Sequence, residues 1–337
     1  MDICDRLAQE KREEIYLSPL GARSKDSGGR LHEEPACPLR TTYQRDRDRI
    51  LHSKSFRRLK HKTQVFIAPD KDHYRTRLTH TLEVAQIART IARALGLNED
   101  LTEAIALGHD LGHTPFGHSG ETVLNRIHKG GFRHNEQSLR VVDFLEHSPR
   151  RRGLNLSQEV RDGILNHSGD QQAMTNEGRV IKYADRIAYI NHDIDDAIRA
   201  HILVKEDLPK DCISLLGETH SDRIERLILG ILTYTRDHNV LGMEEDIYEA
   251  MMELRKFMFS RVYHNPLAKG DENKINKIIV DLYDYYLHED LPESHKGLYE
   301  GRNDSKEDMV CDYIAGMTDR FAISTWTDLF VPENWKG

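Results

Sequence analysis

The chain has 337 residues, a length that can bury one large core or two ordinary ones. Charged residues make up 31% of it and the formal net charge is −8, which argues against a general nucleic-acid binder. No apolar run approaches eighteen residues, which excludes a transmembrane helix, and the four cysteines form no CxxC pair, so any metal must be bound through nitrogen and oxygen.

The N-terminal part, residues 1–45, is expected to form an arm and a helix packed on a core of residues 46–337. Its opening sequence, MDICDRLAQEKREEIYLSP, is charged where a signal peptide is apolar. We therefore expect a soluble cytoplasmic protein with no membrane partner. Residues 20–42 are rich in Gly, Ser and Pro and predict an extended arm or loop.

A basic segment comes next in the chain. Residues 40–62 contain nine Lys or Arg and two Asp, a local net charge of +7. Such a concentration in an acidic protein indicates a specific anionic partner, and single-stranded DNA is one candidate. The alternative is a solvated helix face on which Arg and Asp side chains pair. The sequence leaves both interpretations open.

Helical periodicity dominates from residue 78 onward, after one fair strand candidate at residues 63–67 (TQVFI). The first amphipathic helix ends at Gly96, a typical C-cap, and Asn98 caps the next helix, which ends at the dipeptide His109-Asp110. The first helix carries these apolar residues at three- and four-residue intervals: Leu78, Leu82, Ala85, Ala88, Ile91 and Leu95. The second is expected to bury Leu101, Ala104, Ile105 and Leu111.

Further amphipathic segments fill the rest of the chain. They span residues 179–200, 222–238, 243–264, 274–289 and 305–330. We find no internal repeat and no low-complexity linker, so the pattern predicts a single large all-α domain.

Residues 106–121, ALGHDLGHTPFGHSGE, concentrate chemically active side chains. They place His109, Asp110, His113, His118 and Glu121 within thirteen positions. A carboxylate at the end of a helix whose other face is apolar is costly to bury without a partner, and a divalent cation is a suitable one.

Four residues are candidate ligands of that cation: His80, His109, Asp110 and Asp185. They supply two imidazoles and two carboxylates, a set suited to Mn²⁺, Fe²⁺, Co²⁺, Ni²⁺ or Zn²⁺, and to Mg²⁺ when substrate phosphates complete the coordination. Such a set leaves coordination positions open, as a catalytic site requires.

The order of these ligands resembles that of the HD-domain phosphohydrolases. Six blocks narrow the resemblance to the deoxyguanosinetriphosphate triphosphohydrolase-like proteins: RDRDRILHSKSFRRLKHKTQVF, RTRLTHTLEVAQIART, GHDLGHTPFGHSGE, HNEQSLRVV, ADRIAYINHDIDDA and DYIAGMTDRFA. The resemblance covers about residues 17–330. It implies the HD-domain helical fold and a homo-oligomer, often a hexamer. It also implies hydrolysis of dGTP, and of other dNTPs where the pocket accepts them, to deoxynucleoside and inorganic triphosphate.

That reaction requires water to attack the α-phosphorus and a proton to reach the departing 5′-oxygen. In this resemblance, His118 is the general acid and Glu121 orients its imidazole. His113 and His134 are expected to be donors near the same phosphate. A capping role is the alternative for His118. A structural role is preferred for three further histidines: His128, His147 and His167.

The resemblance also assigns residues to the substrate. Arg77 is expected to reach the α-phosphate from the same helix as His80, while Lys182 and Arg186 would hold the β- and γ-phosphates. Lys182 has the alternative of a plain surface residue.

The sugar would be held by three residues. Tyr189 is expected to pack against the C2′ edge, Asp193 to accept a hydrogen bond from the 3′-hydroxyl, and Gln64 to contact the sugar from the other side. A plain amphipathic helix would also carry Tyr189 and Asp193 on one face.

Two rival functions remain at this stage. One is another HD-family hydrolase, either a nucleotidase or a cyclic-nucleotide phosphodiesterase. The other is a nonhydrolytic nucleotide sensor or single-stranded nucleic-acid binder, which the basic segment favours.

Overall fold

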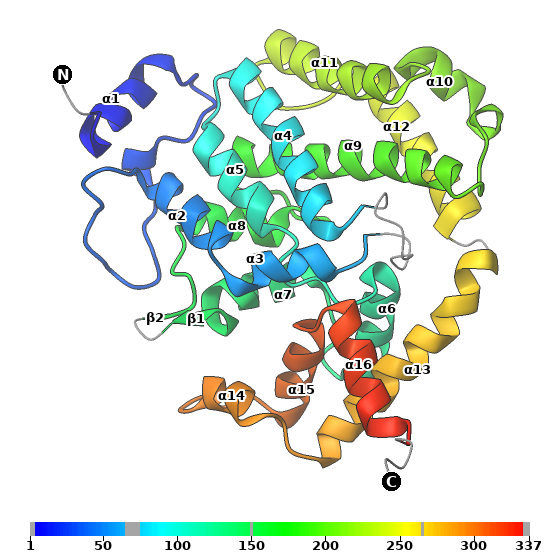
Figure 1. Ribbon diagram of the computed structural model, residues 1–337. Coiled ribbons are helices and arrows are strands. Elements are labelled where there is room, and N and C mark those ends of the chain that lie inside the picture. Colours follow the sequence, from blue (N-terminus) through cyan, green and yellow to red (C-terminus); the bar gives the residue numbers. More distant parts are fainter. Residues whose placement is uncertain (1–3, 65–74, 149–150, 264–265, 333–337) are drawn as a thin grey trace.

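The computed structural model describes residues 4–64, 75–148, 151–263 and 266–332 (Figure 1). These residues form sixteen α-helices, and their only strands are one short antiparallel hairpin, so the predicted all-α class is confirmed. The helices are α1 Arg6–Tyr16, α2 Thr42–Leu51, α3 Lys54–Arg58, α4 Arg77–Leu95, α5 Glu99–Gly108, α6 Gly117–Ile127, α7 His134–Arg140, α8 Gln158–Asn166, α9 Asn176–Arg199, α10 Lys210–Leu216, α11 His220–His238, α12 Glu245–Met258, α13 Pro266–His288, α14 Glu293–Lys296, α15 Lys306–Ala315 and α16 Asp319–Phe330. The strands are β1 His147–Ser148 and β2 Arg151–Arg152.

Two hydrophobic clusters organise the helices. In the larger, α4 packs on α5 and α9, α2 and α8 cover α5, and α11 and α12 pack on α9. The smaller joins α6 to α13, α15 and α16, which form the lower right of the molecule in Figure 1. Within the described residues, no helix is long and apolar enough to cross a bilayer.

The ends of α4 and α5 follow the predicted capping signals. Gly96 adopts φ 64°, a left-handed conformation that glycine adopts without a Cβ clash, and its N–H bonds the last carbonyls of α4. The side chain of Asn98 accepts a hydrogen bond from the backbone N–H of Leu101 and starts α5. These two caps fix the short turn between α4 and α5, the helices that carry His80 and His109.

Two glycines allow α5 and α8 to approach closely. A Cβ on Gly108 would lie 2.6 Å from Cδ1 of Ile164, and one on Gly163 would lie 2.5 Å from Cδ1 of Ile105. A side chain at either position would force the facing isoleucine to shift. The close approach brings together the C-terminal ends of the two helices, where His109 and His167 lie.

Several details differ from the sequence-based expectations. Leu82 is 49% exposed although its spacing placed it on the apolar stripe of α4. The segment 305–330 is two helices, because α15 ends at Ala315 and Thr318 caps a new helix. The hairpin of β1 and β2 was not predicted. Most of the strand candidate 63–67 lies outside the described residues.

The N-terminal helix is tied to the body of the protein through a buried carboxylate. Glu13 of α1 accepts hydrogen bonds from Ser24 and from the side-chain amide of Asn98, the latter at 3.0 Å. The division into residues 1–45 and 46–337 stays a prediction.

Candidate metal centre and active site

The four predicted metal ligands come from three helices and lie together. His80 of α4 faces Asp185 of α9, with 3.0 Å between Nε2 of the histidine and Oδ1 of the aspartate. His109 is the C-cap of α5, and its Nε2 lies 3.6 Å from Oδ2 of Asp110 and 4.0 Å from Oδ1 of Asp185. Ligand atoms that share one ion at 2.0–2.2 Å lie roughly 3–4 Å from each other, so these separations match a common metal.

The orientation of the His109 ring supports the same conclusion. Its Nδ1 lies 2.6 Å from the carbonyl oxygen of Ala106 and donates to it, so Nε2 is the ring nitrogen that faces the carboxylates. This Nε2 is buried and has no hydrogen-bond partner among the described residues. An unpaired imidazole nitrogen beside the buried carboxylate of Asp110 and the half-buried carboxylate of Asp185 fits a divalent cation and is costly without one.

Charge in the site is partly balanced by Arg77, which is fully buried at the start of α4. Its guanidinium donates to Oδ2 of Asp110 and, at 3.3 Å, to the carbonyl oxygen of Thr63. Burial alone would raise the pKa of Asp110, but the neighbouring His109 and Arg77 outweigh it and hold the pKa well below its usual range. Asp110 is therefore ionised and available as a ligand.

A second cluster adjoins the first and centres on Glu121 of α6. Its Oε1 accepts hydrogen bonds from the backbone N–H and from Nδ1 of His134, both at 2.9 Å. Its Oε2 lies 3.4 Å from Nδ1 of His118 and 3.7 Å from Nε2 of His113. The rings of His113 and His134 stack with centroids 4.9 Å apart. All four residues that were assigned to proton transfer or to donation near the phosphate are thus neighbours.

The hydrogen-bond directions in this cluster determine the charge of His134. Nδ1 of His167 bonds the carbonyl oxygen of Ile164 at 2.7 Å, and burial lowers the pKa of His167 to about 3, so its Nε2 is a bare acceptor. Nε2 of His134 lies 3.2 Å from that acceptor and must donate to it. Nδ1 of His134 must also donate, because Glu121 can only accept.

These contacts favour the imidazolium form of His134. Burial opposes its protonation, but the hydrogen bond and charge of Glu121 outweigh burial and raise its pKa. The hydrogen bonds from His118 and His134 hold the pKa of Glu121 well below its usual range, against the effect of burial.

Sequence reasoning gave His167 a structural role. It is the C-cap of α8, as a structural role would require, yet its ring also lies 5.0 Å from that of His109 and 5.2 Å from that of His134. It connects the two clusters. The position of the His167 ring next to His109 depends on the close packing of α8 on α5. The residues adjacent to His167 in the sequence do not reveal that packing.

Comparison with known proteins places this geometry in a family. Residues 77–190 match the HD domain and residues 241–328 match a phosphohydrolase-associated domain. The chain is 55% identical to the deoxyguanosinetriphosphate triphosphohydrolase-like protein of Caldanaerobacter subterraneus subsp. tengcongensis, over 97% of this chain and 96% of that one. It is 48% identical to the protein so named in Clostridium tetani, over 98% of both.

The chain belongs to the deoxyguanosinetriphosphate triphosphohydrolase-like family. The resemblance drawn from its sequence is thereby confirmed, and it is an HD phosphohydrolase. Among solved structures, a hypothetical protein from Aquifex aeolicus superimposes with a TM-score of 0.47 at 21% identity, covering 86% of this chain and 68% of that one.

The residues that this family resemblance assigned to the sugar lie along α9 and before α4. Tyr189 is half-buried and its hydroxyl accepts a hydrogen bond at 2.7 Å from Nε of Arg255, a residue of α12 that sequence reasoning missed. Asp193 is buried one turn further along α9. Gln64 is buried, and its Oε1 has no partner among the described residues.

The two further phosphate candidates differ in their surroundings. The ammonium of Lys182 donates to the carbonyl oxygens of Gly169 and Gln171, so it holds the loop after α8. Arg186 is half-buried directly after Asp185. Both assignments to the triphosphate stay predictions.

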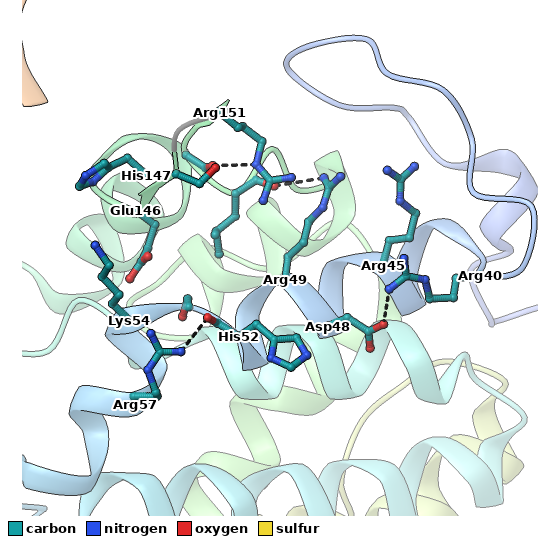
Figure 2. Close-up of a pocket in the computed structure, with 14 residues that line it drawn as sticks. Arg40, Arg45, Asp48, Arg49, His52, Lys54, Arg57, Glu146, His147 and Arg151 are labelled. Carbon is teal, nitrogen blue, oxygen red and sulfur yellow. Dashed lines mark hydrogen bonds and ion pairs between the residues drawn. The ribbon is translucent and has the colours of Figure 1, made fainter.

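The basic segment divides between two places. Lys62 at its end donates to the carbonyl oxygen of His113, next to the site. Residues 40–57, with the β1–β2 hairpin, surround a separate pocket of about 360 Å³ (Figure 2). The pocket is lined by Arg40, Arg45, Asp48, Arg49, His52, Ser53, Lys54, Arg57, Glu146, His147, Ser148, Arg151, Gly153 and Leu154.

Both interpretations of this basic segment find support in the pocket. Arg40 pairs with Asp48 at 2.7 Å, and Arg49 pairs with Glu34 at 2.6 Å, so acidic partners neutralise part of the charge. Burial nevertheless lowers the pKa of Arg49 to about 10, and the nearby charges of Arg30 and Arg151 act in the same direction. Positive charge therefore remains in excess there.

Proposed function

We propose that the protein hydrolyses deoxynucleoside triphosphates, dGTP among them, to the deoxynucleoside and inorganic triphosphate. Water would attack the α-phosphorus and the 5′-oxygen would leave. The observation that carries this proposal is the buried, unpaired Nε2 of His109, which faces Asp110 and Asp185 beside the cluster around Glu121. Few structural roles account for so many buried titratable groups in one place.

His80, His109, Asp110 and Asp185 would hold one divalent metal. Bound at the α-phosphate, such an ion supplies Lewis-acid polarisation of a nonbridging oxygen. The mixed nitrogen and oxygen donors leave Mg²⁺, Mn²⁺, Fe²⁺, Co²⁺, Ni²⁺ and Zn²⁺ as candidates.

One metal ion would neutralise only part of the negative charge of the triphosphate, so cationic side chains are expected to bind the rest. Arg77 is held by Asp110 and by Thr63, with its guanidinium inside the site, so it is positioned to bind the α-phosphate with little loss of side-chain freedom. Arg186 is the second candidate. Lys182 would first have to release its two carbonyl partners, which makes it the weakest of the three.

Proton transfer to the 5′-oxygen is assigned to His118. Its side chain is 68% exposed and can therefore reach a bound substrate, while the rigidly held Glu121 lies 3.4 Å from its Nδ1 and orients it. His113 has two buried ring nitrogens without hydrogen-bond partners among the described residues. Burial holds the pKa of His113 well below its usual range, so it is neutral and has one donor to offer to a phosphate oxygen.

Selection of deoxyribose is assigned to Tyr189. The hydrogen bond from Arg255 fixes its phenol ring, and a fixed ring excludes an added 2′-hydroxyl better than a mobile one. Asp193 would accept a hydrogen bond from the 3′-hydroxyl. The unpaired Oε1 of Gln64 could accept another.

Product analysis tests the proposal. Each dNTP and rNTP is incubated with Mg²⁺, Mn²⁺ or Co²⁺, and the products are separated by anion exchange. Inorganic triphosphate and deoxynucleoside in equal amounts support the proposal. Inorganic phosphate instead would indicate another HD-family hydrolase, and no turnover under any condition would favour a binding protein.

The basic pocket supports a second, binding activity. We propose that single-stranded DNA binds there, because the pocket gathers cations from α2, α3 and the hairpin. Binding should weaken steeply as salt rises, and Arg151→Ala should reduce the slope of log K against log salt by about 1. Lys274→Ala is the matched control, because this lysine of α13 is exposed and lies outside the pocket. We also propose a homo-oligomer, which light scattering of the purified chain would detect.

A further inference from the structure

The C-terminal helix α16 begins with a buried carboxylate that contacts the active-site segments. Asp319 is 6% exposed. Its Oδ1 accepts a hydrogen bond from the backbone N–H of Phe116 at 2.9 Å, and its Oδ2 accepts from the backbone N–H of Thr63 at 2.9 Å and from the Thr63 hydroxyl. One side chain thus holds two segments that are remote from it in sequence.

Both segments lead directly to residues of the site. Phe116 lies in the turn between Asp110 and His118, and it adopts φ 62°, a conformation that is unfavourable for a phenylalanine. An unfavourable conformation persists only when surrounding contacts hold it. Thr63 precedes Gln64, and its carbonyl oxygen accepts a hydrogen bond from Arg77.

Lys62 reinforces the same junction. Its buried ammonium group donates to the carbonyl oxygen of His113 and, at 2.8 Å, to that of Ala315 at the end of α15. The active-site turn is therefore attached to the C-terminal helices at His113 and at Phe116, on both sides of Thr114.

We propose that Asp319 is a positioning residue for the hydrolytic reaction. The phosphohydrolase-associated part of the chain would act on the reaction through it, by fixing the turn that carries His113 and leads to His118. The proposal rests on the proposed function, because it needs His118 to be the proton donor. Among the described residues, Asp319 bonds Thr63 and Phe116 and none of the four predicted ligands, so it is not a catalytic residue.

Asp319→Asn tests this role with almost no change of shape. The amide can still accept from Phe116, but its NH₂ group would face the two donors of Thr63 and break those bonds. We expect kcat for dGTP to fall by about 10- to 100-fold while KM stays within about threefold, since small misplacements of catalytic groups cost that much. Bound metal, measured by elemental analysis, should be unchanged.

The matched control is Asp281→Asn on α13. This carboxylate accepts a hydrogen bond from Nε1 of Trp326 at 2.8 Å and so supports the C-terminal helices alone. It should leave kcat unchanged. Thr63→Val is a milder variant that removes only the hydroxyl donor, and it should lower kcat in the same way but by a smaller factor. It serves as the test if Asp319→Asn folds poorly.

A double-mutant cycle separates positioning from general loss of structure. In the His118→Ala background, Asp319→Asn should lower kcat by less than a further threefold, because the imidazole that Asp319 positions is already absent. If the double variant loses kcat by the product of the two single-variant factors, or if Asp319→Asn alone leaves kcat unchanged, the proposal is overturned.

Amide hydrogen exchange tests the clamp without any activity. Asp319→Asn should lose protection at Phe116 and Thr63, and Asp281→Asn should not. Unchanged protection would overturn the clamp itself. A wild-type protein without dNTP hydrolysis would instead refute the proposed function, and the exchange result would still decide whether Asp319 holds the turn.

Discussion

Metal-dependent stability should separate the four predicted ligands from ordinary buried residues. A metal that binds only the folded chain stabilises it by RT ln(1 + [M]/Kd), which is about 4 kcal/mol when the metal is at one thousand times its Kd. For a chain of this size, that corresponds to a rise in Tm of roughly 5–10 °C. His109→Ala should abolish the rise because it removes the unpaired Nε2.

The cost of the substitution in the absence of metal follows from the contacts. His109→Ala loses one hydrogen bond, from Nδ1 to Ala106, worth about 1 kcal/mol, together with ring packing against His80 and His167. Asp110→Ala leaves the fully buried Arg77 without its carboxylate, a change that costs about 3–5 kcal/mol. His109→Ala is therefore the cleaner test, and Asp110→Ala should unfold at a lower temperature in EDTA.

The assay is thermal unfolding of each variant in EDTA and in excess Mn²⁺, with elemental analysis of the dialysed protein. His128→Ala is the control, because this half-buried histidine bonds Tyr283 of the smaller hydrophobic cluster. The variant should keep the full metal-dependent rise in Tm. A metal shift of wild-type size in His109→Ala, or full metal occupancy in Asp110→Ala, would refute the ligand set.

Three further outcomes are expected. Tyr189→Ala should open space beside C2′ and narrow the ratio of kcat/KM for dGTP over GTP, and an unchanged ratio would put the sugar gate elsewhere. His118→Ala should lower kcat by roughly 10² to 10⁴ with bound metal retained, and loss of metal would reassign His118 as a ligand. Burial lowers the pKa of Lys62 to about 7, below its unfolded value of about 10.4, so the unfolded chain binds more protons between these values. Denaturant titrations should therefore show stability rising with pH above 7 by at most about 1.4 kcal/mol per unit, and Lys62→Met should lack this rise.

Local signals made the helices predictable, and they also pointed to four candidate metal ligands that the structure brings together. Gly96 and Asn98 cap the helices as expected because their conformations depend on neighbouring residues only. The dipeptide His109-Asp110 comes directly after the last residue of α5, where the sequence pattern placed it. Helical periodicity was less reliable for Leu82. It faces outward because the buried face of α4 is turned toward the polar residues Arg77, His80 and Thr81.

What sequence reasoning missed depends on contacts between remote segments. Arg255 reaches Tyr189 only because α12 packs on α9. The charge on the basic segment is reduced by Glu34 and Asp100, which lie outside residues 40–62. No periodicity or motif encodes such pairs, because each partner is an ordinary surface-type residue in its own stretch of chain.

The surroundings of Glu121 change what its substitution should do. Sequence pairing with His118 alone predicts that Glu121→Gln is a weaker version of His118→Ala. In the structure the shorter hydrogen bonds of Glu121 go to His134, through both the backbone N–H and Nδ1 at 2.9 Å, while His118 lies at 3.4 Å. A neutral glutamine would leave the imidazolium of His134 without its counter-charge and would also release His118.

Glu121→Gln should therefore lower kcat at least as much as His118→Ala. His134→Ala should resemble it, because either change breaks the connection from Glu121 through His134 to His167. Steady-state kcat for the three variants, with metal content measured in each, decides the matter. If Glu121→Gln keeps most of the wild-type kcat, Glu121 has only a structural role in holding α7 and the pairing with His118 is incidental.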